Sequence, residues 1–133
     1  MISLRAKITK SIPVQSKIDV CDNSGARIVK VISVKGAKTV RKRAPSAGVS
    51  DYVMVVITEG KPGMKKQVTP AIIVRQKKEY RRPSGERIKF EDNSCVILKD
   101  DKGNPKGTLI KGPIAKEVAE RWPAVAKIAS IVV

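Results

Sequence analysis

The segment from Ala71 to Ile97 constrains the fold most, because it joins two short apolar runs through a stretch rich in arginine and lysine around Pro83-Ser84-Gly85. Successive side chains of an extended chain point to opposite faces, so cations are expected on both faces of the first arm. A strand of this kind cannot lie in a core. We therefore predict a basic hairpin that projects from a folded body and directs guanidinium and ammonium groups at an anionic partner.

The net charge points to the class of partner. The chain has 133 residues and a formal net charge of +16, from 28 basic and 12 acidic residues. A compact body with this excess repels itself unless a polyanion neutralises it, so nucleic acid is the predicted partner. A membrane surface is the competing polyanion, but the sequence contains no long apolar span, no signal-peptide core and no strongly amphipathic basic helix. We expect one folded domain over residues 1–133, a mature N-terminus and no membrane partner.

The cysteine and histidine content limits the chemistry that this chain can perform. Cys21 and Cys95 are isolated from each other in sequence and each neighbours a valine, which predicts small buried hydrophobic residues in a reduced, cytoplasmic protein. The chain contains no histidine, which excludes a zinc set and the Ser-His-Asp and Cys-His arrangements. We expect no metal, no cofactor and no enzymatic activity.

The remaining pattern predicts a mainly β fold. Short runs rich in valine and isoleucine, separated by turn residues at roughly ten-residue spacing, indicate a small barrel or sandwich from Ile18 to Ile110. Residues 52–57 are apolar throughout, so we expect them at the centre of the core, covered on both faces. The predicted strands are Arg27–Val34, Tyr52–Thr58, Ala71–Val74, Arg87–Phe90, Cys95–Leu98 and Thr108–Ile110.

After residue 112 the pattern becomes helical. Ile114, Val118 and Trp122 form one stripe of a short amphipathic helix, with a proline suited to its first turn. Pro123 interrupts this helix and opens a second one through residues 124–129. We predict that this segment covers one end of the barrel, and the alternative is a partner-binding role for its exposed face.

A second cationic segment occupies residues 35–48, where no acidic residue occurs. Phosphate contact is the predicted role of this segment, and a solvated, solubilising face is the alternative. Lys61, Lys65 and Lys66 form a weaker cluster, for which both interpretations stay open. The candidate RNA-binding residues are Lys35, Lys38, Arg41, Lys42, Arg43, Arg75, Lys77, Lys78, Tyr80, Arg81, Arg82, Arg87 and Lys89.

The aromatic residues argue against reading of single-stranded bases. Tyr80 is the only aromatic residue embedded among cations, which is too few for a stacking platform. Recognition is therefore expected to depend on the phosphates and shape of a folded RNA.

The segment that opened this section resembles the signature of a known family, the universal large-subunit ribosomal protein L-fourteen family. A small residue and three aliphatic residues at positions 71–74 precede the basic interval, and Ser84-Gly85, Phe90, Asn93 and Val96-Ile97 follow at the family's spacing. Further matches are Asp22-Asn23-Ser24-Gly25-Ala26, Ala47-Gly48-Val49 with Asp51, Gly107-Thr108 and Gly112-Pro113. The form of the arm and of the C-terminal region is similar to archaeal and eukaryotic members, whereas residues 1–17 resemble no part of the family.

This resemblance implies a five-stranded barrel with a projecting basic ribbon over residues 18–111 and two short helices within residues 112–133. It also implies binding to large-subunit ribosomal RNA and neighbouring large-subunit proteins at the face that meets the small subunit, in support of assembly and translation. In this family the C-terminal region is where the anti-association initiation factor six docks. By that analogy Lys116, Glu120 and Arg121 are the candidate partner-binding residues.

Two other functions remain open at this level. The charge excess and the few aromatic residues also fit a protein that coats chromosomal DNA. Glu91 and Asp92 beside the basic arm could hold magnesium in a carboxylate-dependent nuclease, whereas a simple turn at Asp92 and Asn93 explains the same residues. The cluster at residues 100–105 superficially resembles a calcium loop but has Lys102 in place of a ligand oxygen. It therefore predicts a turn that reverses the direction of the chain.

Overall fold

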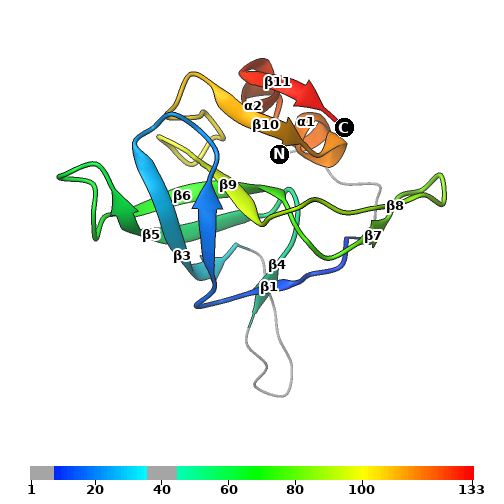
Figure 1. Cartoon of the computed structure of the whole chain (residues 1–133), viewed down its shortest axis with the longest axis horizontal. Coiled ribbons are helices and arrows are strands. Elements are labelled where there is room, and N and C mark those ends of the chain that lie inside the picture. The colour runs from blue at the N-terminus through cyan, green and yellow to red at the C-terminus, as the bar shows by residue number, and fades with distance from the viewer. Residues whose placement is uncertain (1–7, 36–44) are drawn as a thin grey trace.

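A closed barrel of five strands forms the body of the molecule (Figure 1). The computed structural model describes residues 8–35 and 45–133. Around the barrel the strands follow the order β2-β3-β5-β6-β9, and every neighbouring pair is antiparallel except β2 and β9, which close the barrel in parallel. The mainly β architecture and the five-stranded barrel predicted from the sequence are confirmed. The barrel strands are β2 (Lys17–Val20), β3 (Ala26–Val34), β5 (Tyr52–Gly60), β6 (Val68–Arg75) and β9 (Ser94–Ile97).

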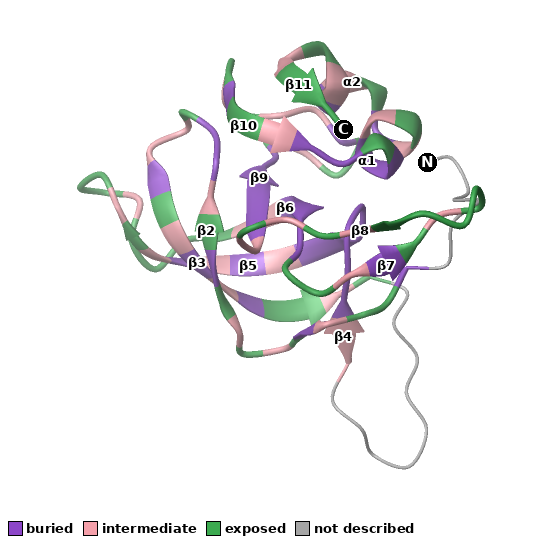
Figure 2. Cartoon of the chain, turned by 45° about the vertical axis from the view of Figure 1, so that its right-hand side comes forward, coloured by how far each residue is buried: buried purple, intermediate pink, exposed green. Residues whose placement is uncertain are grey.

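Alternating side chains of these strands build two apolar clusters. Val53, Val55 and Ile57 of β5 point into the barrel, where they join Ala71 and Ile73 of β6. The intervening residues of the same strands contribute to a second cluster outside the barrel, under the C-terminal segment. The inner face of β5 is fully buried, whereas Met54 and Val56 on the outer face are partly exposed, so the predicted coverage of both faces holds for only part of residues 52–57. Figure 2 shows β5 alternating between buried and intermediate residues, and β9 buried.

The C-terminal segment covers this second cluster, which confirms the predicted lid over one end of the barrel. It consists of β10 (Ile110–Ile114), α1 (Lys116–Arg121), α2 (Pro123–Lys127) and β11 (Ala129–Val132). Trp122 anchors the segment, because its indole Nε1 donates a 2.9 Å hydrogen bond to the backbone oxygen of Ser50. The second helix, predicted through residue 129, ends at Lys127, and Ala129 instead begins β11, which pairs in parallel with β10.

Two small antiparallel sheets complete the described structure. β1 (Ile12–Pro13) pairs with β4 (Ser46–Ala47), and β7 (Tyr80–Arg81) pairs with β8 (Arg87–Ile88). Ile8 and Ile12 are buried against the body. Residues 8–16 therefore pack on the barrel.

Both cysteines are free and buried, as predicted from their apolar neighbours. Cys95 lies in the barrel cluster, and Cys21 Sγ is 3.4 Å from the backbone oxygen of Cys95. Burial raises the pKa of Cys21 from 9.0 to about 12, and burial also raises the pKa of Cys95. Each folded-state thiol therefore keeps its proton at a pH where an unfolded thiol has lost it.

This difference predicts that the free energy of unfolding falls in alkaline solution. The protonated thiols contribute full stability below the unfolded pKa of 9.0, and this contribution is lost for Cys21 as the pH rises from 9.0 towards 12. The slope is at most about 1.4 kcal/mol per pH unit for each thiol. Urea unfolding at several alkaline pH values should show a shallower decline for Cys21→Ala than for the unmodified chain. Parallel declines in the two proteins would contradict the assignment.

Candidate nucleic-acid interface

The basic arm, defined as residues 76–93, leaves the barrel after β6 and returns at β9. Figure 1 shows that β7, β8 and their connecting turn extend well beyond the barrel. The turn is closed by two hydrogen bonds of 2.8 Å, from the amide of Arg82 to the oxygen of Glu86 and from the amide of Gly85 to the oxygen of Arg82. Gly85 has a φ of +93°, which favours glycine. The predicted projecting hairpin is therefore confirmed.

Buried polar contacts fix the direction in which the arm leaves the barrel. Gln76 is fully buried, and its amide oxygen accepts a 2.9 Å hydrogen bond from the backbone N–H of Val49. Its amide nitrogen donates to the backbone oxygens of Thr9 and Lys78, at 3.1 and 2.9 Å. On the returning strand, the side-chain oxygen of Asn93 accepts a hydrogen bond from the amide of Lys77. The base of the arm is thus held from both sides.

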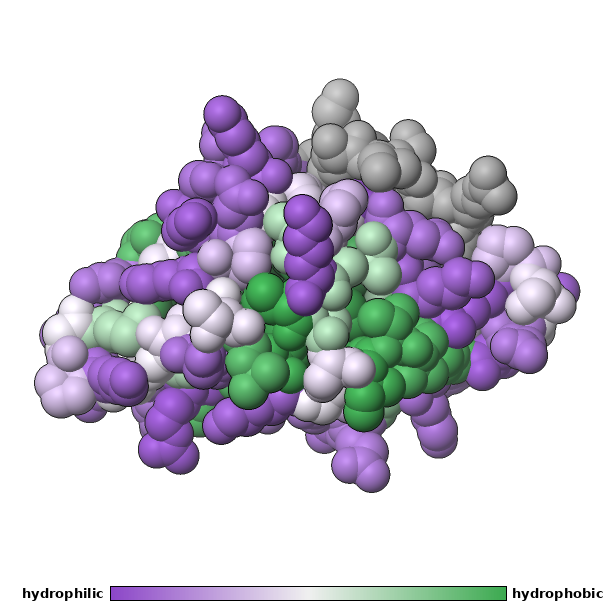
Figure 3. All heavy atoms as spheres, turned by 90° about the horizontal axis from the view of Figure 1, so that it is seen from above, coloured by the Kyte–Doolittle hydropathy of each residue, from purple (hydrophilic) through white to green (hydrophobic). Residues whose placement is uncertain are grey.

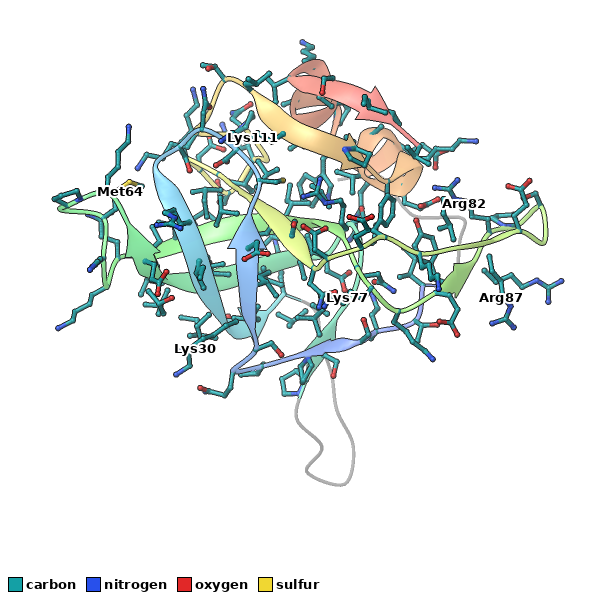
Figure 4. The ribbon with its side chains drawn as sticks, in the orientation of Figure 1. Lys30, Met64, Lys77, Arg82, Arg87 and Lys111 are labelled. Carbon is teal, nitrogen blue, oxygen red and sulfur yellow. The ribbon has the colours of Figure 1, made fainter. Side chains whose placement is uncertain are left out.

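The two faces of the hairpin differ. Tyr80 pairs with Ile88 on the inner face, which packs into the second apolar cluster under the C-terminal segment. Arg81 pairs with Arg87 on the exposed face. The prediction of cations on both faces is therefore wrong for β7 and β8, because the C-terminal segment covers the inner face. In Figure 4, Arg87 points away from the body, whereas Arg82 lies beside the C-terminal segment.

Two of the predicted RNA-binding residues point inward and contact a buried carboxylate. Glu117 in α1 is 4% exposed and accepts a 2.5 Å hydrogen bond from the hydroxyl of Tyr80. Arg82 Nε lies 3.1 Å from Oε2 of Glu117, and Arg82 Nη2 donates to the backbone oxygen of Val133 at 2.7 Å. Burial, and then the hydrogen bond to Glu117, raise the pKa of Tyr80. The outward orientation expected for Tyr80 and Arg82 is therefore corrected.

Arg75 is also buried, with 8% of its surface exposed. Its Nη1 donates to the backbone oxygens of Lys111 and Pro113, at 3.0 and 3.1 Å. Its Nη2 donates to Ser94 Oγ at 2.9 Å, and its Nε lies 2.9 Å from Oδ1 of Asp92. The guanidinium thus joins β6, β9 and β10, and our expectation that Arg75 faces an RNA partner is corrected.

The other candidates of the arm lie at the surface. Lys78 is 3.3 Å from the carboxylate of Glu79, in a pair that is exposed to solvent. The exposed cations of the arm are Lys77, Lys78, Arg81, Arg87 and Lys89.

Only part of the second cationic segment is described. Lys35 is exposed, with its ammonium 5.2 Å from the centroid of the Tyr52 ring. The remaining predicted residues of this segment, Lys38, Arg41, Lys42 and Arg43, lie outside the described residues.

The candidate partner-binding residues on α1 also divide into two groups. Lys116 and Glu120 are exposed. Arg121 is half-buried and turned towards the barrel, where its Nη1 donates to the backbone oxygen of Ser50 at 3.3 Å and lies 3.7 Å from Asp51 Oδ1. The surface of α1 that a partner can reach is therefore centred on Lys116 and Glu120.

Asp92, one of the residues considered for a magnesium site, and Asp100, in the cluster that resembles a calcium loop, have structural partners. Asp92 accepts hydrogen bonds from Arg75 and from Ser94 Oγ, and Asp100 accepts from the backbone amides of Lys102 and Asn104 in the predicted reversal. Within residues 8–35 and 45–133, no three acidic or cysteine side chains are grouped as metal ligands. In the same ranges no helix has the length and apolar character needed to cross a membrane.

The barrel, the cationic arm and the large positive charge define a small basic β-barrel of the nucleic-acid-binding class. The family described as ribosomal protein L14p/L23e matches residues 11–133. The chain is 55% identical over 133 residues to large ribosomal subunit protein uL14 of Nanoarchaeum equitans, with complete coverage of both proteins. It is 51% identical to uL14 of Pyrobaculum islandicum, covering 99% of this chain and 92% of the relative, and 47% identical over the full length of uL14 of Methanocella arvoryzae.

The chain belongs to the L14p/L23e family of ribosomal proteins, in its archaeal-type branch. This confirms the resemblance based on the signature segment. It also confirms a ribosomal protein of the large subunit, and hence the expected cytoplasmic location. The expectation that residues 1–17 resemble no part of the family is wrong, because the family match begins at residue 11 and the Nanoarchaeum equitans relative aligns over the full chain.

Proposed function

We propose that the exposed face of the basic arm binds phosphates of large-subunit ribosomal RNA and so fixes this protein in the subunit. The observation that carries the proposal is the pairing of Arg81 directly opposite Arg87 on the exposed face of a hairpin whose inner face is buried. Like charges directly opposite each other on a strand pair destabilise it, and a phosphate placed between two guanidinium groups removes this repulsion. The rigid base of the arm holds these groups in place before RNA arrives, which lowers the entropy cost of binding.

The double variant Arg81→Ala with Arg87→Ala tests this assignment. We expect weaker binding to a fragment of large-subunit ribosomal RNA, and a slope of log affinity against log salt that is smaller by about 0.7–0.9 for each lost phosphate contact. Filter binding or fluorescence anisotropy at several salt concentrations measures both quantities. The matched control is Lys99→Ala with Lys127→Ala, which removes the same charge from exposed sites outside the arm.

An unchanged salt slope in the arm variant would show that the arm is not part of the RNA interface. Duplex DNA provides the second comparison, because equal affinity for DNA and ribosomal RNA at matched salt would favour a chromosome-coating function instead.

We further propose that the C-terminal segment forms the protein-facing side of the molecule, in contact with the small subunit and with initiation factor six, and that it supports subunit assembly. Lys116 and Glu120 are exposed on α1, and Ile131, Val132 and Val133 are 54%, 48% and 45% exposed. Figure 3 shows apolar surface among hydrophilic residues on the face seen from above. Apolar patches with a charged rim are typical of protein interfaces.

A further inference from the structure

The last strand of the C-terminal segment, β11, is held mainly by hydrogen bonds. The side chain of Ala129 is half-buried, whereas those of residues 130–132 are exposed, as Figure 2 shows. Among the strands that the structure describes, β11 pairs only with β10. Elements with little buried apolar surface open locally at a lower free energy than the core does. The position of β11 therefore depends on contacts that reach it from other elements.

One such contact comes from the basic arm. Arg82 Nη2 donates a 2.7 Å hydrogen bond to the backbone oxygen of Val133, directly after β11, and the same guanidinium is paired with Glu117 of α1. The oxygen of Val133 also accepts a 2.9 Å hydrogen bond from the amide of Lys116, and the amide of Val133 donates to the oxygen of Ile114 at 2.9 Å. A single arginine of the arm thus joins the end of the last strand to the first helix.

The residue between the two inward side chains of the arm faces the opposite way. Tyr80 and Arg82 contact the C-terminal segment, and Arg81 between them lies on the exposed face, opposite Arg87. Neighbouring side chains of a strand point in opposite directions from one backbone. A ligand that holds Arg81 therefore also fixes the backbone from which Arg82 extends.

The turn of the arm acts on the same backbone. The amide of Gly85 donates to the oxygen of Arg82, and the amide of Arg82 donates to the oxygen of Glu86, each at 2.8 Å. Without a bound anion, the like charges of Arg81 and Arg87 oppose the hairpin. Order in the turn and the position of the Arg82 guanidinium are thus linked through one short stretch of chain.

The base of the arm is attached to the C-terminal segment separately. Asp92 pairs with Arg75, whose guanidinium donates to the backbone oxygens of Lys111 and Pro113 in β10. Arg75 is buried, so this attachment is expected to stay formed when the tip of the arm moves. β10 is therefore anchored independently of the tip, and Arg82 is the described contact through which the tip reaches the end of β11.

We infer that Arg82 couples the two faces of the molecule, so that RNA bound on the outer face of the arm keeps α1 and β11 closed on the barrel. Without RNA the hairpin fluctuates more, Arg82 leaves Glu117 and Val133 more often, and the C-terminal segment opens more often. The inference rests on the proposed function for the ligand of the arm, and it adds regulation of the protein-facing side. A protein partner therefore meets the closed surface more constantly on the RNA-bound chain than on the free chain.

The coupling is tested first without RNA, by straining the turn of the arm. Gly85 has a φ of +93°, and a Cβ added there would lie 4.0 Å from Arg81 Nη2, so Gly85→Ala strains the backbone without a clash. An L residue in this conformation weakens the turn by about 5–30-fold. We expect hydrogen exchange at the amides of Lys116 and Val133, measured by NMR, to become about twofold faster or more.

Gly63 provides the matched control. Its φ is +89° and nothing lies within 4 Å of a Cβ added there, so Gly63→Ala introduces the same kind of strain into the turn between β5 and β6. Figure 4 shows Met64 of this turn at the opposite side of the molecule from Arg87. Exchange at Lys116 and Val133 should therefore keep the rate of the unmodified chain.

Arg82→Lys is the variant that removes the coupling. It keeps the positive charge of the arm but loses the planar fork that reaches both Glu117 and Val133. Gly85→Ala introduced into this variant should cause no further acceleration, because the strained turn no longer acts on the C-terminal segment.

The second measurement adds a saturating fragment of large-subunit ribosomal RNA. Exchange at Lys116 and Val133 should slow about fivefold or more in the unmodified chain. It should slow less than about twofold in Arg82→Lys, which still binds RNA through Arg81 and Arg87. Any ligand stabilises the whole folded state, so the difference between the two proteins isolates the contribution of the Arg82 contact.

The possible results have different meanings. Unchanged exchange in Gly85→Ala, or equal acceleration in Gly63→Ala, would overturn the coupling whether or not RNA binds. If RNA binds the unmodified chain but leaves exchange at Lys116 and Val133 unchanged, the regulatory role is wrong and the arm assignment stands. Failure of RNA to bind the unmodified chain would refute the proposed function, and regulation by RNA with it.

Discussion

Replacement of Glu117 by alanine is expected to lower the free energy of unfolding by about 3–5 kcal/mol, because it leaves a largely buried guanidinium without its counter-ion. Glu117 is the shared partner of Tyr80 and Arg82, and the side chains of Arg82 and Glu117 are 13% and 5% exposed. Removal of the carboxylate also leaves the Tyr80 hydroxyl without its acceptor. Urea denaturation followed by circular dichroism measures the loss.

Two further variants refine this prediction. Glu117→Gln keeps an acceptor for Tyr80 and loses only the ionic partner, so its cost should be smaller, about 1–3 kcal/mol. Glu120→Gln, on the same helix, removes an exposed carboxylate and should change stability by less than about 0.5 kcal/mol. Hydrogen exchange in residues 80–88 should also accelerate in Glu117→Ala, since the arm loses its attachment to α1. Equal stability of the Glu117→Ala and Glu120→Gln proteins would show that the buried network contributes nothing.

Replacement of Arg75 is the second change with a large expected effect. Arg75→Ala should cost about 3–5 kcal/mol, because Asp92 loses its cation and the backbone oxygens of Lys111 and Pro113 lose their donor. Arg75→Lys retains the charge but not the planar fork, so it should still cost about 2 kcal/mol or more. Thermal and urea unfolding provide the values.

Lys77→Ala is the matched control for Arg75, since Lys77 is exposed two residues further along the chain. Its stability should remain within about 0.5 kcal/mol of that of the unmodified protein. A small cost for both Arg75 variants would mean that other contacts hold β10 against the barrel. Gly112 shows independently that the Arg75 guanidinium packs closely against β10, because the φ of Gly112 is +79° and a Cβ there would lie 2.5 Å from Nη1 of Arg75.

The strands that carry a strong local pattern could be predicted from the sequence to within a few residues. The predicted strand Tyr52–Thr58 corresponds to β5, Tyr52–Gly60, and Arg27–Val34 corresponds to β3, Ala26–Val34. β11 was missed because its partner, β10, is remote in sequence and no local signal encodes a parallel pairing. The first helix begins at Lys116 and not at Pro113, since Pro113 and Ile114 belong to β10.

The candidate interface was harder to predict than the fold. The sequence shows that arginines and lysines are concentrated in the arm. It does not show which of these cations pair with a carboxylate from a distant part of the chain. Arg82 turns inward because Glu117 lies under it, across a separation of 35 residues.

The parallel closure of the barrel has a consequence for synthesis of the chain. β2 ends at Val20, but the strand that closes the barrel against it, β9, begins only at Ser94. A polypeptide emerging from the exit tunnel therefore cannot complete its interior until residue 97 is outside. Before that point its valine and isoleucine side chains remain in contact with water, in a segment whose positive charge attracts cellular polyanions. Nascent-chain chaperones thus have an extended period in which to shield this protein before it reaches its site of assembly.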